Sequence, residues 1–271
     1  MMMLGAILGD MAGSIYERNN LKTDKPKEIN LLNPRCKFTD DTVLTCAIAE
    51  AALSDRDYKK AIKEWALRYP NAGYGGMFRK WFRQDNPQPY NSFGNGSAMR
   101  VSPIGFLFYT LEETLAEAKK SAECTHNHPE GIKGAQAIAA AVFMARNHKS
   151  KKEIKDYIEQ TFQYNLSQTI DEIRPSYSFD VTCQGSVPQS IIAFLESENF
   201  VHALQIAISI GGDSDTIACM TGSIAEAYYE HIPQDYIEFA LEKMPDDMKQ
   251  VRDYMEIEFK KRLNIRGNNG F

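Results

Sequence analysis

The chain has 271 residues, of which 43% are hydrophobic and 25% charged, and its formal net charge is -5. That mildly acidic balance gives no electrostatic footprint for nucleic acid or an anionic membrane, so neither is an expected partner. No stretch has the roughly 18–20 uncharged apolar residues of a membrane span, and the N-terminus lacks the basic leader of a signal peptide. The five cysteines are scattered without a C-x-x-C pair, so we expect a cytoplasmic protein.

Helical periodicity dominates the chain. Apolar residues recur at i, i+3 and i+4, and Ser, Thr, Asp or Asn precedes several of these segments. The pattern predicts an all-α protein, a single compact multi-helix domain over residues 1–271 with the last few residues frayed. The expected helices are 42–53, 58–69, 111–123, 130–147, 151–162, 186–197, 200–210, 215–230 and 235–244.

Two long stretches, residues 68–105 and 165–185, interrupt the helical pattern. The first is rich in Gly, Pro, Asn and aromatic residues, and the second is a long connection between two expected helices. Long loops inside a compact helical domain are usually either functional or disordered. The aromatic content predicts ordered, functional loops.

Two acidic clusters open two of the expected helices. One carboxylate at a helix start is explained by capping, but two per helix, before helices too apolar to be exposed, exceed that need. Four carboxylates brought together without cations would repel one another. The oxygen-only set suits Mg²⁺, Mn²⁺ or Ca²⁺ rather than zinc. The clusters are Thr39, Asp40 and Asp41, followed far along the chain by Asp213, Asp215 and Thr216.

Other metal motifs fit this sequence poorly. An EF-hand loop beginning at Asp213 would need Gly at its sixth position and Glu at its twelfth, and both are missing. Cys124, His126 and His128 lie close together in "ECTHNHPE", but no fourth zinc ligand is nearby. We therefore interpret that segment as a loop leading into a helix.

Six segments together resemble the ADP-ribosylglycohydrolase family. In family order they are "GAILGDMAGSIYE", "FTDDT", "GYGGMFRKW", "GNGSAMRVSPIG", "THNHPEGIKGAQAIA" and "GGDSDTIA", and they extend from residue 5 to about residue 230. The resemblance implies an all-α fold with a binuclear centre, two Mg²⁺ or Mn²⁺ ions, at the bottom of a central cleft. Its implied metal ligands are Thr39, Asp40, Asp41, Asp213, Asp215 and Thr216, and its implied catalytic residues are Glu17 and Asp40.

The glycine-rich segments suit an ADP-ribose ligand. Glycines allow close backbone approach, and N–H groups at a helix start near Ser97 could cradle a pyrophosphate without arginines. Tyr90 or Phe93 could stack on the adenine. The resemblance supports substrate contacts at Gly73, Gly75, Gly96, Ser97, Met99 and His126, with His126 at the ribose.

The resemblance implies a hydrolase that cleaves the glycosidic bond between the distal ribose and an acceptor, a protein or a small molecule. The metals would bind the 2″ and 3″ hydroxyls of that ribose, and Asp40 or Glu17 would act as general base. Two alternatives stay open. One is a metal-dependent phosphohydrolase acting on ADP-ribose-like nucleotides, and the other is a non-catalytic, crystallin-like or ADP-ribose-binding member. No residue decides between arginine, serine and other acceptors.

Overall fold

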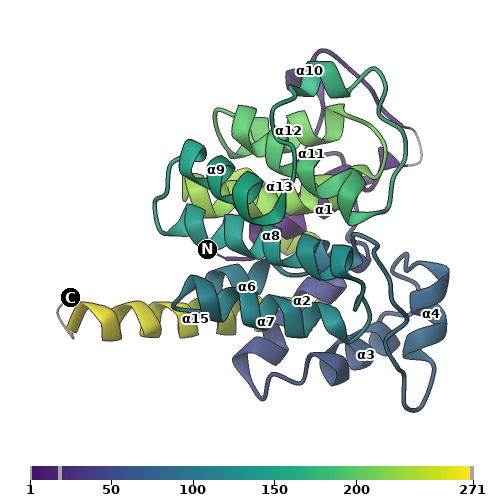
Figure 1. Cartoon of the computed structure of the whole chain (residues 1–271), viewed down its shortest axis with the longest axis vertical. Coiled ribbons are helices and arrows are strands. Elements are labelled where there is room, and N and C mark those ends of the chain that lie inside the picture. Colours follow the sequence, from purple (N-terminus) through teal and green to yellow (C-terminus); the bar gives the residue numbers. More distant parts are fainter. Residues whose placement is uncertain (1, 18–19, 269–271) are drawn as a thin grey trace.

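The computed structural model of the chain describes residues 2–17 and 20–268 (Figure 1). Within these ranges the only β contact is an isolated antiparallel bridge between Gly94 and Thr182, so the predicted all-α fold is confirmed. The fraying expected of the last few residues concerns 269–271, which lie outside the described residues. The helices are α1 (Leu4–Gly13), η2 (Pro26–Glu28), α2 (Asp40–Leu53), α3 (Tyr58–Arg68), α4 (Gly76–Phe82), α5 (Gly96–Met99), α6 (Ser102–Leu107), α7 (Leu111–Glu123), α8 (Pro129–Arg146), α9 (Lys151–Phe162), α10 (Ile170–Ile173), α11 (Cys183–Glu196), α12 (Phe200–Ser209), α13 (Ser214–Tyr229), α14 (Gln234–Lys243) and α15 (Asp246–Asn268).

All nine expected segments are helical, with ends within three residues of those predicted. The prediction that residues 68–105 and 165–185 are non-helical is wrong in part, because they contain α4, α5, α10 and parts of α6 and α11. Four of these helices have only four to seven residues, too short for a period of 3.6 to stand out. Helix α1 is buried on every side, so it has no polar face to reveal its period.

Helix α13 is the central element of the fold and packs against α1, α8, α11 and α12 (Figure 1). The contact with α1 is made backbone to backbone. Gly5, Gly9 and Gly13 recur every fourth residue, which places them on one face of α1. A Cβ added at Gly9 would overlap the carbonyl oxygen of Ala218, and one added at Gly13 would overlap the backbone of Asp215. Glycine is therefore what allows α1 to lie directly on α13.

We expect Gly9→Ala to lower the free energy of unfolding by about 3 kcal/mol or more, because backbone atoms cannot move aside for the new methyl group. Urea unfolding followed by circular dichroism measures the change. Gly76→Ala is the matched control, since a Cβ there meets no atom within 4 Å and a helical alanine is favourable. Equal stability of the two variants would contradict the close packing of α1 on α13.

The two long loops meet on one side of the molecule. Around the Gly94–Thr182 bridge, the N–H of Asn95 donates to the carbonyl oxygen of Val181 at 2.8 Å. The N–H of Cys183 donates to the carbonyl oxygen of Phe93 at 3.0 Å. These bonds join the glycine-rich residues 94–96 to the second loop, and the expectation that both loops are ordered and functional stays a prediction.

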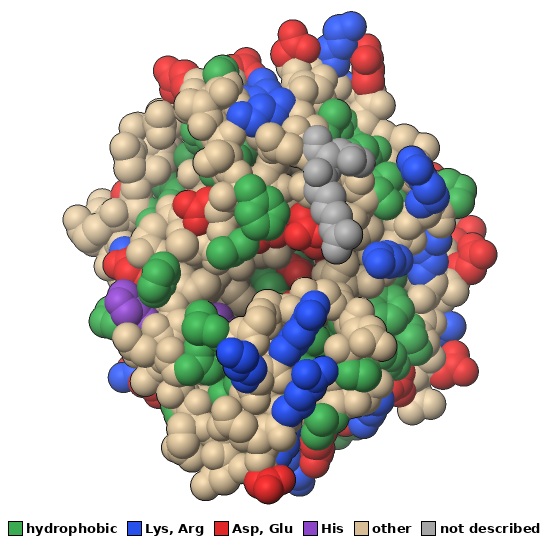
Figure 2. Space-filling model, turned by 90° about the vertical axis from the view of Figure 1, so that its right-hand side faces the viewer, with side chains coloured by type: hydrophobic (Ala, Val, Ile, Leu, Met, Phe, Trp, Pro, Cys, Tyr) green, Lys and Arg blue, Asp and Glu red, His purple; other side chains and the backbone are tan. Residues whose placement is uncertain are grey.

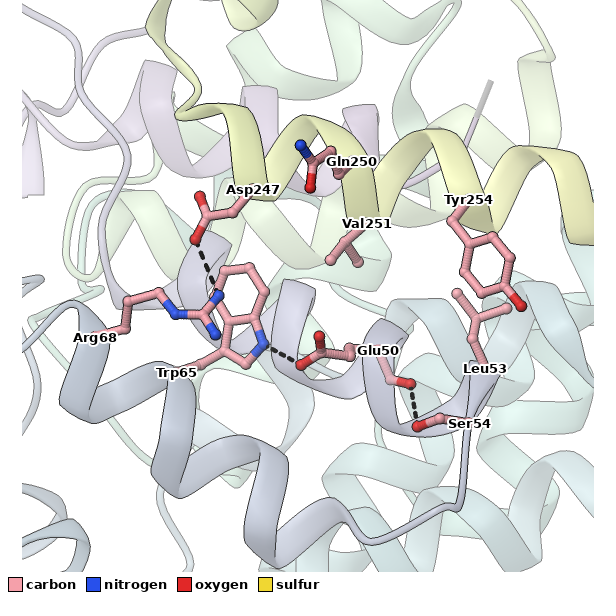
Figure 3. Close-up of a pocket in the computed structure, with 9 residues that line it drawn as sticks. All are labelled: Glu50, Leu53, Ser54, Trp65, Arg68, Asp247, Gln250, Val251 and Tyr254. Carbon is pink, nitrogen blue, oxygen red and sulfur yellow. Dashed lines mark hydrogen bonds and ion pairs between the residues drawn. The ribbon is translucent and has the colours of Figure 1, made fainter.

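Helix α15 docks on α2, reaches Arg68 at the end of α3 and then extends past the other helices (Figure 1). Its Asp247 carboxylate accepts hydrogen bonds from Arg68 at 3.0 Å and from the Tyr69 hydroxyl at 2.6 Å. Figure 3 shows a pocket of about 310 Å³ at this junction, where the Trp65 indole donates to Glu50 at 2.6 Å. Its lining includes none of the predicted site residues. None of the described helices combines the length and the apolar character that a membrane span requires.

Candidate metal centre

Three helices bring carboxylates together at one point. Asp10, Asp41 and Asp215 lie on α1, α2 and α13, and one oxygen from each lies within 4.8 Å of the others. A second group with the same spacing joins Glu17, Asp213 and Asp215. Asp215 belongs to both groups, so the two positions are adjacent. The structure thus brings together two acidic clusters that are remote in sequence.

Asp10 connects α1 to the start of α2 through hydrogen bonds. Its carboxylate accepts hydrogen bonds from the backbone N–H of Thr39 at 2.8 Å and from that of Thr42 at 3.1 Å. The hydroxyls of both threonines also donate to it. It therefore caps α2 from a different helix, assisted by Thr39, whose hydroxyl accepts from the Asp41 N–H at 3.4 Å. Capping by Asp10 leaves the Asp41 side chain free to face α13.

The remaining acidic residues lie around this pair of groups. The Asn95 side chain donates to Asp213 at 2.6 Å, and Asp213 itself makes no capping bond to α13. Glu17 is half-buried, as is Asp40. Asp40 belongs to neither group. Its Oδ1 atom faces Gly73, where an added Cβ would lie 2.9 Å away in a backbone conformation with φ of 124° that favours glycine.

Crowding and burial raise the carboxylate pKa values. Burial is the main cause at each residue, and it raises the pKa of Asp10 to about 6. The pKa of Asp213 is also raised to about 6, and that of Asp40, which faces the Asp10 charge as well, to about 8. The pKa values of Asp41 and Asp215 lie well above their usual range for the same reasons. Because these buried charges repel one another, the cluster resists full ionisation.

The residues fit a hard divalent cation. The donors are all oxygens, and Oδ1 of the buried Asp41 has no hydrogen-bond partner among the described residues. The hydroxyls of Thr39 and Thr216 lie 3.3 and 3.4 Å from its other oxygen. An unpaired carboxylate oxygen that is buried among other carboxylates is costly in a metal-free protein and well placed for a cation.

Some of the predicted substrate residues lie near the acidic centre. Gly73 and Gly75 precede α4, with Gly73 beside Asp40, and a Cβ added at Gly96 would lie 3.2 Å from Nε2 of His126. The N–H groups of Gly96 and Ser97 open α5 and have no partner within that helix. Figure 2 shows acidic side chains on the floor of a hollow, with Lys and Arg side chains along one rim.

Two predicted contacts have buried side chains. Ser97 is fully buried and its hydroxyl donates to the Gly131 carbonyl oxygen at 2.7 Å, while Met99 is 5% exposed. Any ligand contact by Ser97 would therefore involve its backbone, whereas Met99 has a small exposed area like that of His126. The interpretation of "ECTHNHPE" as a loop leading into a helix is confirmed, since His128 caps α8 by accepting the Glu130 N–H at 3.1 Å.

The family model for ADP-ribosylglycohydrolase matches residues 1–264. The chain belongs to the ADP-ribosylglycohydrolase family. Members of this family are hydrolases, and the predicted enzyme class is confirmed. ADP-ribosylhydrolase ARH3 of Homo sapiens is 27% identical over 86% of this chain and 86% of its own length.

One further relative and one solved structure are also similar to this chain. ADP-ribosylarginine hydrolase Tri1 of Pseudomonas putida is 25% identical over 87% of this chain and 72% of its own. A solved structure described as an ADP-ribosylglycohydrolase-related protein complex superposes with a TM-score of 0.73 over 95% of both chains, at 19% identity. That structure supports the fold of this family member.

The sequence patterns did not indicate a role for Asp10, Asn95 or the buried Arg100. Asp10 was visible only as an interruption of an apolar run, and Asn95 as one of several polar loop residues. Their importance comes from contacts with distant residues, Asp10 with Thr39 and Asn95 with Asp213. The only signal in the sequence was a single carboxylate inside an otherwise apolar helix.

The raised pKa values predict an unusual pH dependence for the metal-free protein. Folding raises these pKa values from about 3.8 to about 6 for Asp10 and Asp213 and about 8 for Asp40. Their contribution to stability is therefore fully present below about pH 4 and is lost as the pH rises through about 6 and 8. In EDTA, the unfolding temperature should fall over this window, and saturating Mg²⁺ should reduce the fall.

Asp41→Asn is the control variant, because it removes one of the repelling charges. Its unfolding temperature in EDTA should fall less steeply with pH than that of the unaltered protein. Parallel profiles of the two proteins would show that the cluster does not destabilise the metal-free fold.

Proposed function

We propose that this enzyme removes ADP-ribose from an ADP-ribosylated protein or small molecule by hydrolysing the glycosidic bond at the distal ribose. The observation that carries the proposal is the pair of carboxylate groups that share Asp215 in a chain of this family. The names of the relatives support ADP-ribosylated substrates, and one of them specifies arginine. Residues 1–271 would act as one domain. The cytoplasm is the proposed location, in keeping with five free cysteines.

We propose two Mg²⁺ or Mn²⁺ ions as cofactors. When bound, such a pair orients ribose hydroxyls and increases the acidity of a coordinated water. Because Asp215 lies in both carboxylate groups, it would contact both ions. The proposed ligands are Asp10, Asp41 and Asp215 for one ion and Asp213 and Asp215 for the other, with the hydroxyls of Thr39 and Thr216 and the carboxylate of Asp40 as further candidates. Glu17, the third member of the second group, would stay unbound and act as a base.

The residues of the chain would orient the substrate and move a proton. The oxygen of water bonds to the anomeric carbon as the bond to the acceptor breaks, and the acceptor leaves with a proton. Glu17 is the preferred proton acceptor because it is half-buried beside Asp213 and Asp215. Asp40 is the second candidate, but burial and the nearby Asp10 charge raise its pKa to about 8 and make it a weaker choice at neutral pH.

Asp215→Asn should lower turnover by at least about 100-fold, because it removes the carboxylate shared by both groups. Substrates ADP-ribosylated on arginine or on serine, incubated with Mg²⁺, supply the assay. Activity should disappear in EDTA and return with Mg²⁺ or Mn²⁺. Release of intact ADP-ribose supports the proposal, whereas release of AMP would indicate a phosphohydrolase.

Glu17→Gln should separate binding from chemistry. The amide keeps the shape of the side chain but takes up protons poorly, so kcat should fall by about 100-fold or more. ADP-ribose should still raise the unfolding temperature in the presence of Mg²⁺. If Glu17→Gln retains most of the parent kcat while Asp40→Asn loses it, Asp40 is the proton acceptor.

A further inference from the structure

Arg100 is a fully buried arginine at the end of α5. Its Nη2 atom donates to the Ser121 carbonyl oxygen at 2.9 Å and to the Thr125 hydroxyl oxygen at 2.8 Å. Its Nε and Nη1 atoms have no hydrogen-bond partner among the described residues, and no described carboxylate forms an ion pair with it. Burying an unpaired guanidinium costs several kcal/mol, so packing alone is a poor reason for an arginine here.

The bond from Arg100 occupies one of the two lone pairs of the Thr125 hydroxyl oxygen. A guanidinium can only donate, so the Thr125 oxygen is the acceptor in that bond. The hydroxyl proton is then available for Nδ1 of His126, which lies 2.7 Å from the Thr125 oxygen. The Cys124 sulphur is close by but is a much weaker acceptor than an imidazole nitrogen.

A hydrogen bond accepted at Nδ1 determines which tautomer the neutral His126 ring adopts. Burial, followed by the charge of Arg100, lowers the pKa of His126 well below its usual range, so the ring is neutral near pH 7. A neutral imidazole carries one proton. With Nδ1 acting as acceptor, that proton lies on Nε2.

The Nε2 atom faces the glycine-rich loop. An added Cβ would lie 3.2 Å from it at Gly96 and 3.6 Å from it at Gly94. No hydrogen bond joins Nε2 to any residue in the described part of the chain. Between the two glycines, Asn95 donates to Asp213 of the acidic centre.

We propose that Arg100 and Thr125 are positioning residues that hold His126 as its Nε2–H tautomer, so that the ring donates a hydrogen bond to an oxygen of a ligand lying against residues 94–96. This inference rests on the proposed function for the identity of the ligand, an ADP-ribosyl group. The tautomer itself is independent of that function. Neither Arg100 nor Thr125 needs to touch the ligand.

The tautomer can be measured directly by ¹⁵N NMR of the histidine rings in the full-length protein. The chain has five histidines, and His126→Gln identifies the signals of His126. At neutral pH, the proton should be on Nε2 in the parent and in Thr125→Ser, which keeps the hydroxyl. In Thr125→Val, the signals should shift towards the Nδ1–H form. A proton on Nδ1 in the parent, or unchanged signals in Thr125→Val, would overturn the proposal.

Ligand binding provides the second readout. With Mg²⁺ present, Thr125→Val should bind ADP-ribose about tenfold more weakly and raise KM by a similar factor, with kcat within about twofold of the parent. Thr125→Ser should restore both values. Weaker binding without a change of tautomer would show that Thr125 has only a structural role, and it would overturn the proposal. Parent protein with the expected tautomer but no affinity for ADP-ribose would instead contradict the proposed function.

Discussion

The direct contact between the backbones of α1 and α13 is the constraint on which the site depends. Gly13 lies against the backbone of Asp215, and this leaves no room for a side chain between the two helices. The same contact brings Asp10, three residues earlier on α1, within ligand distance of Asp215. Because Asp10 also caps α2, the position of one helix determines where all three carboxylate-bearing helices meet.

Bringing these carboxylates together opposes folding. Burial raises the pKa of each buried aspartate, and only some of the charge is offset by hydrogen bonds. Asp10 accepts bonds from Thr39 and Thr42, but Oδ1 of Asp41 has no described partner. Such a cluster is costly unless function requires it, since apolar residues of similar size would pack there at no electrostatic cost. Divalent cations bound among the carboxylates would attract them and so outweigh their mutual repulsion.

The sequence predicted nine helices, from the recurrence of apolar residues, and both acidic clusters, because those features are local. It also placed His126 and Gly96 in one site, and the structure brings these two residues together. It did not predict α1, which is buried on every side, or the role of Asp10, whose partners are on another helix. Nor could it show that the Ser97 side chain points into the protein, because that orientation depends on the position of α8.

Binding of Mn²⁺ to the metal-free protein, followed by electron paramagnetic resonance, tests most directly whether α1, α2 and α13 form a binuclear centre. Two ions per chain with a spin-coupled signal are expected, because Asp215 lies within ligand distance of both groups. Asp215→Asn should abolish the coupled signal. A single isolated Mn²⁺ signal in the parent, or a coupled signal that survives in Asp215→Asn, would contradict a centre bridged by this residue.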